Sequence, residues 1–419
     1  MMKKSNIFAA IFGNIMEWYD FTLYIFLAPV LAQNFFTQQS HLNALLSTFM
    51  IFAIGFFVRP LGSILFGHLG DRWGRSTTLK LSILFISIST LGIALLPNNQ
   101  SWGIYAALGL CFLRLIQGFC IGGEFAGSII YLSEMAPANR RALASCMSNN
   151  GSNIGVLAAT LIAATTANVM SENTFYQYGW RLPFLLGGVI GLIGLWLRRD
   201  LSETPIYHRL ATQARLPRLP LLTVLRFHKK EVINIFLLVI MAATGSYALM
   251  DFMSNYLHQY FHYSLSEALT IQSLYNALTF ILVTAAAKLC DHYGRRSILL
   301  AAAIGYLLFS IPCFYFLNAQ GSWLWLLPLV TFYCLEQAST PVTIIEIFPA
   351  QARYTGVSLG YNLAMALVGG TAPMINTWLV AKFNNPLIIA YYLMVGAALA
   401  LMVIIKKLPR EFGIRCELV

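Results

Sequence analysis

Two carboxylic acids near the start of the chain have the spacing of a proton-exchange site. Glu17, Asp20 and Tyr24 follow steps of three and four within an apolar run, so they share one stripe of a helix. An ionisable side chain in the middle of a membrane costs about 2.5–3.5 kcal/mol or more, so it usually faces a cavity or a partner. Two acids one turn apart are also expected to hold at least one proton between them. The stripe is therefore a candidate for proton coupling; the alternative is that these acids only neutralise Arg59 or Arg114 between helices.

A second polar stripe runs through a later apolar segment. Arg114, Gln117, Glu124, Ser128 and Tyr131 fall on one face of a helix. A polar face on an otherwise apolar membrane helix is expected to line a central cavity. Arg114 with Glu124 is therefore a second candidate pair for proton coupling, and Gln117 and Tyr131 are candidates to contact a substrate.

The second half of the chain offers acids and aromatic rings, and its apolar runs contain no Lys or Arg at depth. Asp251 and Glu336 lie within these runs. Acids beside aromatic faces favour a cationic or zwitterionic head group, whereas an anionic substrate would rely on Arg59 and Arg114. For any single ring, packing in the core or at the membrane interface is the alternative. The candidate substrate-binding residues are Arg59, Tyr24, Gln117, Tyr131, Asp251, Tyr275, Glu336 and Tyr361.

These side chains need apolar helices to position them. Of 419 residues, 58% are hydrophobic and 10% charged, whereas charged residues make up about a quarter of a soluble domain. A helix needs about 20 mostly apolar residues to cross a bilayer, so the sequence predicts an all-α membrane protein with twelve transmembrane helices. A polar cytoplasmic loop at 199–231 separates two six-helix bundles, 1–198 and 232–419. The predicted helices are 7–33, 44–67, 79–97, 102–134, 143–169, 181–198, 232–260, 267–289, 297–317, 323–347, 355–381 and 386–405.

The net charge of +11 follows the predicted topology. Nearly all basic residues fall on one side of a twelve-helix path, with Lys382 as the exception. The positive-inside rule then places both termini and the 199–231 loop in the cytoplasm. The basic surplus therefore indicates membrane orientation and not binding to nucleic acid.

A charged, glycine-rich turn occurs twice in the chain. Asp71 and Arg75 of the first copy have counterparts in Asp291 and Arg295, at an offset of 220 residues (291 − 71). Self-similarity at a distance of about half the chain indicates an internally duplicated architecture.

The first copy of this turn, G-x-x-x-D-R-x-G-R at 67–75, resembles the loop between the second and third helices of the major facilitator superfamily. Three further patterns resemble its metabolite:proton symporter family: G-N-x-x-E-W-Y-D-F at 13–21, R-P-L-G at 59–62 and R-x-x-Q-G-x-x-x-G-G-E at 114–124. The resemblance runs over nearly the whole chain. The proline/betaine transporters are the most similar group, and carriers of citrate, 2-oxoglutarate, shikimate and dicarboxylates are sister groups.

The resemblance implies a major facilitator fold with two pseudo-symmetric bundles and a site near mid-membrane, between helices one, four, seven and ten, that opens alternately to either side. It implies a transporter and not an enzyme: proton-coupled uptake of a zwitterionic osmolyte or amino acid across a bacterial cytoplasmic membrane. Symport of an organic anion (citrate, a dicarboxylate or a citrate-type siderophore), proton-coupled export and a non-transporting receptor are the alternatives. We expect a monomer in membrane lipid that needs only its substrate and protons, with no metal and no cofactor besides the proton gradient.

The resemblance also implies a conformational latch at the cytoplasmic face. Asp71 would dock on a helix N-terminus of the opposite half, which carries about half a positive charge, while Arg72 and Arg75 pair with acids. A proline turn flanked by Glu and Arg occurs at 134–141 and again at 346–353, and would complete two latches. The candidate latch residues are Gly67, Asp71, Arg72, Gly74, Arg75, Glu134, Arg140, Asp291, Arg295, Arg296, Glu346 and Arg353.

The two acidic stripes generate a first prediction. Asp20→Asn and Glu124→Gln should each abolish uphill uptake of substrate, because an amide cannot carry the coupled proton. The measurement is accumulation of substrate in cells or vesicles under an imposed proton gradient. If both single variants still concentrate substrate, neither acid is the coupling residue.

Overall fold

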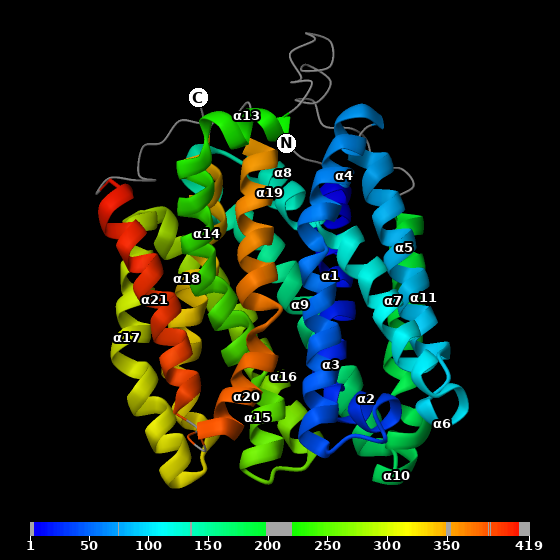
Figure 1. Cartoon of the computed structure of the whole chain (residues 1–419). Coiled ribbons are helices and arrows are strands. Elements are labelled where there is room, and N and C mark those ends of the chain that lie inside the picture. Colours follow the sequence, from blue (N-terminus) through cyan, green and yellow to red (C-terminus); the bar gives the residue numbers. More distant parts are fainter. Residues whose placement is uncertain are drawn as a thin grey trace.

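The computed structural model of the chain is a bundle of long helices that run roughly along one axis (Figure 1). It describes residues 4–73, 75–134, 136–197, 220–348, 353–383, 385 and 387–409; the side chains at 4–10, 67–79, 124, 134, 138, 197, 220 and 251 lie outside the description. No strand occurs among these residues. Helices satisfy their own backbone hydrogen bonds, as a chain in lipid requires. The predicted all-α class is confirmed.

The first half of the chain forms one bundle. Its elements are α1 (Lys4–Phe26), α2 (Ala28–Phe35), α3 (His41–Phe57), α4 (Arg59–Trp73), α5 (Arg75–Leu95), α6 (Asn99–Trp102), α7 (Ile104–Ile121), α8 (Glu124–Glu134), η1 (Ala138–Arg140), α9 (Arg141–Val169), α10 (Glu172–Thr174), η2 (Phe175–Gly179) and α11 (Arg181–Leu197). In this bundle α1 packs against α9 and α11, and α5 packs against α7 and α11.

The second half forms the other bundle. Its elements are α13 (Pro220–Phe227), α14 (Lys229–Thr244), η3 (Gly245–Asp251), α15 (Met253–Tyr260), α16 (Leu265–Tyr293), α17 (Arg295–Gln320), η4 (Trp323–Leu326), α18 (Leu327–Ile347), α19 (Arg353–Ala364), η5 (Met365–Gly369), α20 (Ala372–Phe383) and α21 (Ile388–Lys407). Here α17 packs against α18 and α21, and α14 packs against α19 and α21. The two bundles meet where α9 packs against α16 and α18, and where α4 packs against α19.

The helices agree with the predicted membrane spans. By length and composition, 8 helical stretches of the described chain are able to cross a membrane, or up to 10 if each of two bent pairs is one span. The bent pairs are Ile11–Phe26 with Ala28–Phe35 (63°) and Glu172–Gly179 with Arg181–Trp196 (45°). The other two predicted spans are α5, with a shorter apolar part at Lys80–Leu95, and α18. Within the predicted 199–231 loop, α13 is helical and α14 already begins at Lys229.

Several spans are interrupted. The fourth predicted span breaks into α7 and α8 at Gly122 and Gly123. Two others contain π-helical turns, η3 between α14 and α15 and η5 between α19 and α20. Single π-helical turns inside longer helices are frequent at functional sites. The turns η3 and η5 are therefore candidate positions for a functional site.

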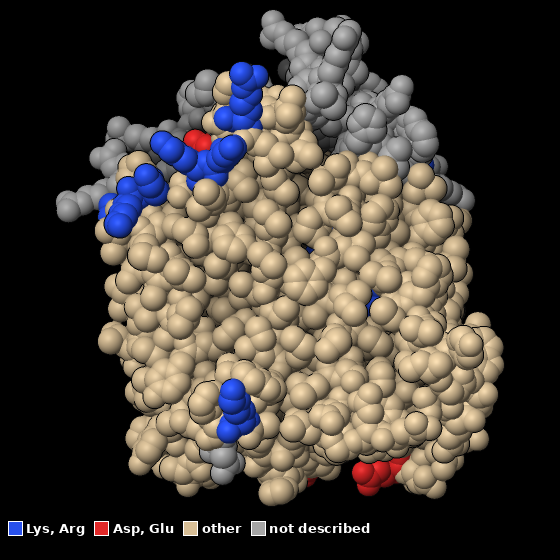
Figure 2. Space-filling view, viewed as in Figure 1, with Lys and Arg blue, Asp and Glu red and all other residues tan. Residues whose placement is uncertain are grey.

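The two ends of the bundle differ in charge. We call the end that carries α13 the α13 end, and the opposite end, which carries α15, the α15 end (Figure 1). Basic side chains gather at the α13 end (Figure 2). Those on α13, the start of α14 and the end of α21 are exposed: Arg226, Lys229, Lys230, Lys406 and Lys407. Lys382, the exception noted in the sequence, is exposed at the end of α20.

Glycines bring backbones of the first bundle into direct contact. A Cβ added to Gly118 on α7 would lie 1.7 Å from the carbonyl oxygen of Gly55 on α3, and one added to Gly62 on α4 would lie 1.8 Å from the carbonyl oxygen of Phe119. Such small residues allow close helix packing in membranes, where no hydrophobic drive holds helices together. This packing fixes α7, and the polar residues it carries, against α3 and α4.

Gly118→Ala should therefore destabilise the protein. The new methyl group has no space next to a backbone carbonyl, and overpacking typically costs about 1–3 kcal/mol or more. We expect a lower melting temperature in detergent, measured by a thermal shift assay. Gly123→Ala is the matched control, because its Cβ would lie 3.4 Å from the nearest atom, an ordinary contact. Equal melting temperatures for Gly118→Ala and the unmodified protein would contradict the packing argument.

Candidate functional site

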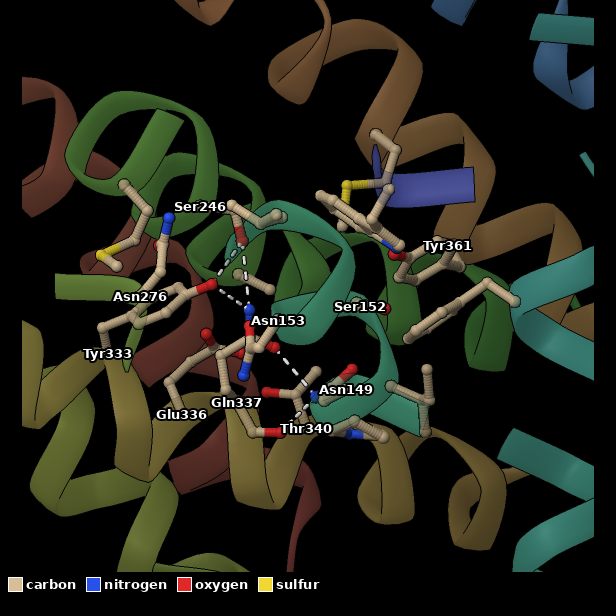
Figure 3. Close-up of a pocket in the computed structure, with 18 residues that line it drawn as sticks. Asn149, Ser152, Asn153, Ser246, Asn276, Tyr333, Glu336, Gln337, Thr340 and Tyr361 are labelled. Atoms are coloured by element: carbon tan, nitrogen blue, oxygen red, sulfur yellow. Dashed lines mark hydrogen bonds between the residues drawn. The ribbon is translucent and has the colours of Figure 1, made fainter. Parts of the chain in front are cut away.

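A small cavity lies between the two bundles (Figure 3). It is lined by α1, α8 and α9 of the first bundle and by α14, η3, α16, α18, α19 and η5 of the second. The cavity has a volume of about 30 Å³, which is room for about two water molecules. The side chains therefore close around the site, and a larger ligand needs them to move apart. The polar lining residues are Asn149, Ser152, Asn153, Ser246, Asn276, Tyr333, Glu336, Gln337, Thr340 and Tyr361.

A hydrogen-bond network crosses the cavity from one bundle to the other. Asn149 Nδ2 on α9 donates to the main-chain oxygen of Gln337 on α18 (2.5 Å) and to its Oε1 (2.9 Å). Gln337 Nε2 in turn donates to Ser246 Oγ (3.2 Å) and to the hydroxyl of Tyr333. Figure 3 shows these bonds as dashed lines at one side of the cavity. The network joins the bundles through neutral groups, so it can break and re-form without exposing a charge.

Glu336 is the acid that lines this cavity. Its side chain is 0% exposed, and no cation bonds to it among the described residues. The Thr340 hydroxyl, one turn further along α18, is the polar group that interacts with it. The described lining residues include no Lys or Arg. Because an isolated buried carboxylate is costly unless it is paired or protonated, this position is suited to a proton or to the cationic group of a ligand.

Aromatic rings form further walls of the cavity. Trp18 on α1 is 8% exposed and stacks on Tyr247 of η3, with ring centroids 6.1 Å apart. Phe125 on α8 stacks on Tyr361 of α19, with centroids 4.6 Å apart and an interplanar angle of 19°. Each pair joins one ring from each bundle. Aromatic faces beside an acid are a surface that attracts organic cations.

A buried ion pair lies inside the first bundle. Arg59 Nη2 on α4 is 2.8 Å from Glu17 Oε1 on α1, and both side chains are 2% exposed. The guanidinium also lies over the ring of Phe56, 4.9 Å from its centroid. Neither charged residue lines the cavity. Glu17, one of the acids expected to neutralise an arginine between helices, is therefore a direct partner of Arg59.

Arg114 is held from several sides in the same bundle. Its Nη1 donates to Gln117 Oε1 (2.8 Å), and Gln117 Nε2 donates to Thr90 Oγ1 (2.8 Å). The guanidinium carbon lies 4.1 Å from the ring centroid of Phe21 and 4.4 Å from that of Tyr24. Arg114 Nε and Nη2 have no hydrogen-bond partner among the described residues. Arg114 is thus fixed in position, and two of its three guanidinium nitrogens are without an acceptor among the described residues.

Asp20 lies in the field of Arg114 without a direct ion pair. The carboxyl group is 0% exposed and forms no salt bridge among the described residues. It interacts with the Thr90 hydroxyl and with the charge of Arg114. Gly187 on α11 leaves room for it, since an added Cβ there would lie 2.9 Å from Asp20 Oδ1. Asp20 can therefore gain or lose a proton without first breaking a salt bridge, unlike Glu17.

At the α13 end, an aspartate docks on a helix N-terminus of the opposite bundle. Asp291 near the end of α16 accepts hydrogen bonds from the main-chain N–H groups of Ala142 (2.9 Å) and Leu143 (3.0 Å) at the start of α9. Arg295 lies 3.4 Å from Asp291 and 3.2 Å from Glu346. This is the geometry that the resemblance implied for Asp71, here present in the second copy of the turn.

The break between α7 and α8 makes a further contact between the bundles. Asn362 Nδ2 on α19 donates to the carbonyl oxygen of Gly122 (2.9 Å), and Ser358 Oγ donates to the same oxygen (3.3 Å). The Tyr354 hydroxyl donates to the carbonyl oxygen of Gly123 (2.7 Å). The carbonyls released by the helix break thus find donors on the opposite bundle, as buried backbone groups require.

Toward the α15 end, the contacts between bundles are largely aromatic. Phe49 on α3 meets Phe252 edge to face, with centroids 6.1 Å apart, and Phe56 meets Tyr247 with centroids 5.3 Å apart. Asn255 Nδ2 on α15 donates to the carbonyl oxygen at the end of α1, residue Ile25 (3.0 Å). Contacts between bundles therefore lie on both sides of the cavity.

The structure separates the candidate substrate residues into groups. Glu336 and Tyr361 line the cavity. Within the first bundle lie Arg59, Gln117 and Tyr24, whose hydroxyl donates to the carbonyl oxygen of Thr48 (3.1 Å). The hydroxyl of Tyr275 donates to the carbonyl oxygen of Trp323 (2.6 Å), and Tyr131 is partly buried on α8; neither lines the cavity.

The candidate latch residues are also divided. Asp291, Arg295 and Glu346 come together, while Arg353 Nε donates to the carbonyl oxygen of Phe348 (3.0 Å). Arg296 is partly buried and Arg140 is exposed. The other candidate site residues lie outside the description, Gly74 as a whole residue and the rest by their side chains. They are Glu124 for proton coupling, Asp251 for substrate binding, and Gly67, Asp71, Arg72, Gly74, Arg75 and Glu134 for the latch.

Sequence reasoning missed the amide and hydroxyl groups of the cavity. Asn149, Ser152 and Asn153 enter it from α9, the fifth predicted span, and Gln337 and Thr340 enter from α18. The signal was the run N-N-G-S-N at 149–153 in the middle of an otherwise apolar segment. Neutral polar residues in membrane helices are less conspicuous than charges, but each needs a partner there.

The chain resembles known transporters over most of its length. The Major Facilitator Superfamily profile matches residues 10–373. The chain is 31% identical over 412 residues to the glycine betaine/proline/ectoine/pipecolic acid transporter OusA of Dickeya dadantii, covering 95% of this chain and 82% of the relative. It is 30% identical over 412 residues to the proline/betaine transporter of Salmonella typhimurium, with 95% and 82% covered.

The fold is shared with solved structures. The proton:xylose symporter XylE bound to 6-bromo-6-deoxy-D-glucose matches with a TM-score of 0.76 at 20% sequence identity, covering 98% of this chain and 96% of that chain. A D-xylose-proton symporter matches with a TM-score of 0.75 at 22% identity, covering 98% of both chains. These matches confirm the predicted arrangement of two helical bundles. The chain therefore belongs to the major facilitator superfamily and is a membrane transporter, not an enzyme.

Proposed function

We propose that the protein takes up a small zwitterionic solute, an osmolyte or amino acid of the proline/betaine type, together with a proton. The observation that carries this proposal is the cavity between the bundles, where the described side chains offer one buried acid, aromatic faces and amides but no Lys or Arg. A ligand with a cationic group compensates the acid, and an anion finds no opposite charge there. The names of the Dickeya and Salmonella relatives support the same substrate class.

Proton coupling is assigned to Asp20 in the field of Arg114. Of the two acids on α1, Glu17 is neutralised by direct contact with Arg59, whereas Asp20 has no direct ion pair among the described residues. Trp18, two residues before Asp20 on α1, lines the cavity, so substrate contact and proton site share one helix. The proton gradient is the driving force, and no metal or organic cofactor takes part.

Alternating access follows from the two sets of contacts between bundles. The docked Asp291 holds the α13 end closed, and its release opens the cavity on that side; the aromatic contacts close the α15 end. Because basic residues gather at the α13 end, that end faces the cytoplasm, with both termini, in a bacterial inner membrane. The bundles correspond to residues 1–198 and 232–419, and one chain supplies the whole cavity, so a monomer suffices.

Uptake into proteoliposomes tests the proposal. With the outside more acidic than the inside, the purified protein should accumulate radiolabelled glycine betaine or proline above the external concentration, and only equilibrate it when the gradient is collapsed. Vesicles without protein are the control. Accumulation of citrate or 2-oxoglutarate alone would favour the organic-anion reading, and accumulation only under the reversed gradient would favour export.

Asp291→Asn should weaken closure at the α13 end. An aspartate at a helix N-terminus contributes about 0.3–1 kcal/mol, up to about 2 when partly buried, so the open population should rise by about 2- to 30-fold. Asn139 and Lys407 are exposed, one on each bundle. Spin labels attached to cysteines at these two positions, in an otherwise cysteine-free protein, report the separation of the bundles by pulsed electron paramagnetic resonance. Lys288→Gln, an exposed charge on the same helix, is the matched control. An unchanged distance distribution in Asp291→Asn would contradict the latch.

A further inference from the structure

The cavity contains unpartnered donors from the bundle that does not carry its acid. Asn153 on α9 and Trp18 on α1 are each 8% exposed, and Asn153 Nδ2 and Trp18 Nε1 have no hydrogen-bond partner among the described residues. Both line the cavity, as does Glu336 of the other bundle. Buried donors normally find a partner, because a buried donor left without a hydrogen bond costs about 1–3 kcal/mol. Two orphaned donors in one small cavity therefore indicate an acceptor that a ligand brings.

We infer that Asn153 and Trp18 bind the carboxylate end of the substrate, while Glu336 holds its cationic end. This inference rests on the proposed function and adds the direction in which the substrate lies. The donors are on the first bundle and the acid is on the second, so the two ends of one zwitterion hold the two bundles together. Both donors are neutral. They can donate hydrogen bonds to a carboxylate, and they leave no uncompensated charge when the site is empty.

Neighbouring side chains do not offer the same group. The Asn149 amide already donates to Gln337, and the Ser152 hydroxyl donates to the carbonyl oxygen of Ser148 (3.2 Å). Figure 3 shows Asn149, Ser152 and Asn153 entering from α9, and Glu336 and Thr340 entering from α18. Among these three, Asn153 is the residue whose donor is unused. The assignment therefore falls on Asn153 and not on the amide run as a whole.

The role of a carboxylate ligand can be isolated with two probes that share a trimethylammonium group. Glycine betaine carries a carboxylate, and choline carries a hydroxyl in its place. Asn153→Leu should weaken glycine betaine binding by about 10- to 100-fold, the value of a hydrogen bond to a charged group, and leave choline binding within about twofold. Trp18→Phe, which keeps a ring and removes the N–H, should act in the same direction. Glu336→Gln should weaken both probes.

Equilibrium binding of each probe to the purified full chain is the measurement, with melting temperature as the folding check. Thr165→Ala, on the same helix but outside the cavity lining, is the matched control and should bind both probes as the unmodified protein does. If the unmodified protein does not bind choline, a loss of glycine betaine affinity of less than about tenfold in Asn153→Leu, relative to Thr165→Ala, overturns the inference.

The outcomes separate the inference from the proposed function. If the unmodified protein binds neither glycine betaine nor proline, the proposed substrate class fails, and the inference fails with it. If it binds glycine betaine, but folded Asn153→Leu and Trp18→Phe lose both probes equally or lose neither, the inference alone is overturned. If Asn153→Leu does not fold, Asn153→Ala replaces it, because it also removes the amide donor.

Discussion

The structure depends on how ionisable side chains are compensated inside an apolar bundle. Each charge buried in a membrane needs an opposite charge, hydrogen bonds or a proton. The first bundle satisfies this internally: Glu17 meets Arg59 directly, and Asp20 lies in the field of Arg114. The second bundle leaves Glu336 without a cationic partner among the described residues. These described charges of the first bundle are therefore compensated, whereas Glu336 is poised to accept positive charge.

This difference between the bundles connects binding to movement. The cavity between them is small, and polar groups from both sides meet across it through Asn149 and Gln337. At the α13 end the contact between bundles depends on a charge at a helix terminus, and at the α15 end it depends on aromatic packing and one amide. Contacts of this size can break singly, so small differences in binding energy are enough to shift the population between states.

Much of the fold could be predicted from the sequence, because apolar length and basic-residue position are local signals. The all-α class and most of the membrane spans were readable, although the predicted helices 7–33 and 102–134 are each broken in the structure. The site was readable only in part. Charges drew attention to Glu17 and Arg59, which pair with each other within the first bundle, whereas the neutral Asn153 carries no such signal. Which face of α9 meets α18 depends on how the two bundles pack, and a single helical pattern does not contain that information.

The central claim is that substrate and proton cross together. The direct measurement is the internal pH of proteoliposomes, read with a trapped pH-sensitive dye, when glycine betaine is added outside with no imposed proton gradient. The account predicts that the inward substrate gradient acidifies the interior, since each solute molecule enters with a proton. Entry of radiolabelled glycine betaine with no change in internal pH would contradict proton coupling and make the protein a passive carrier.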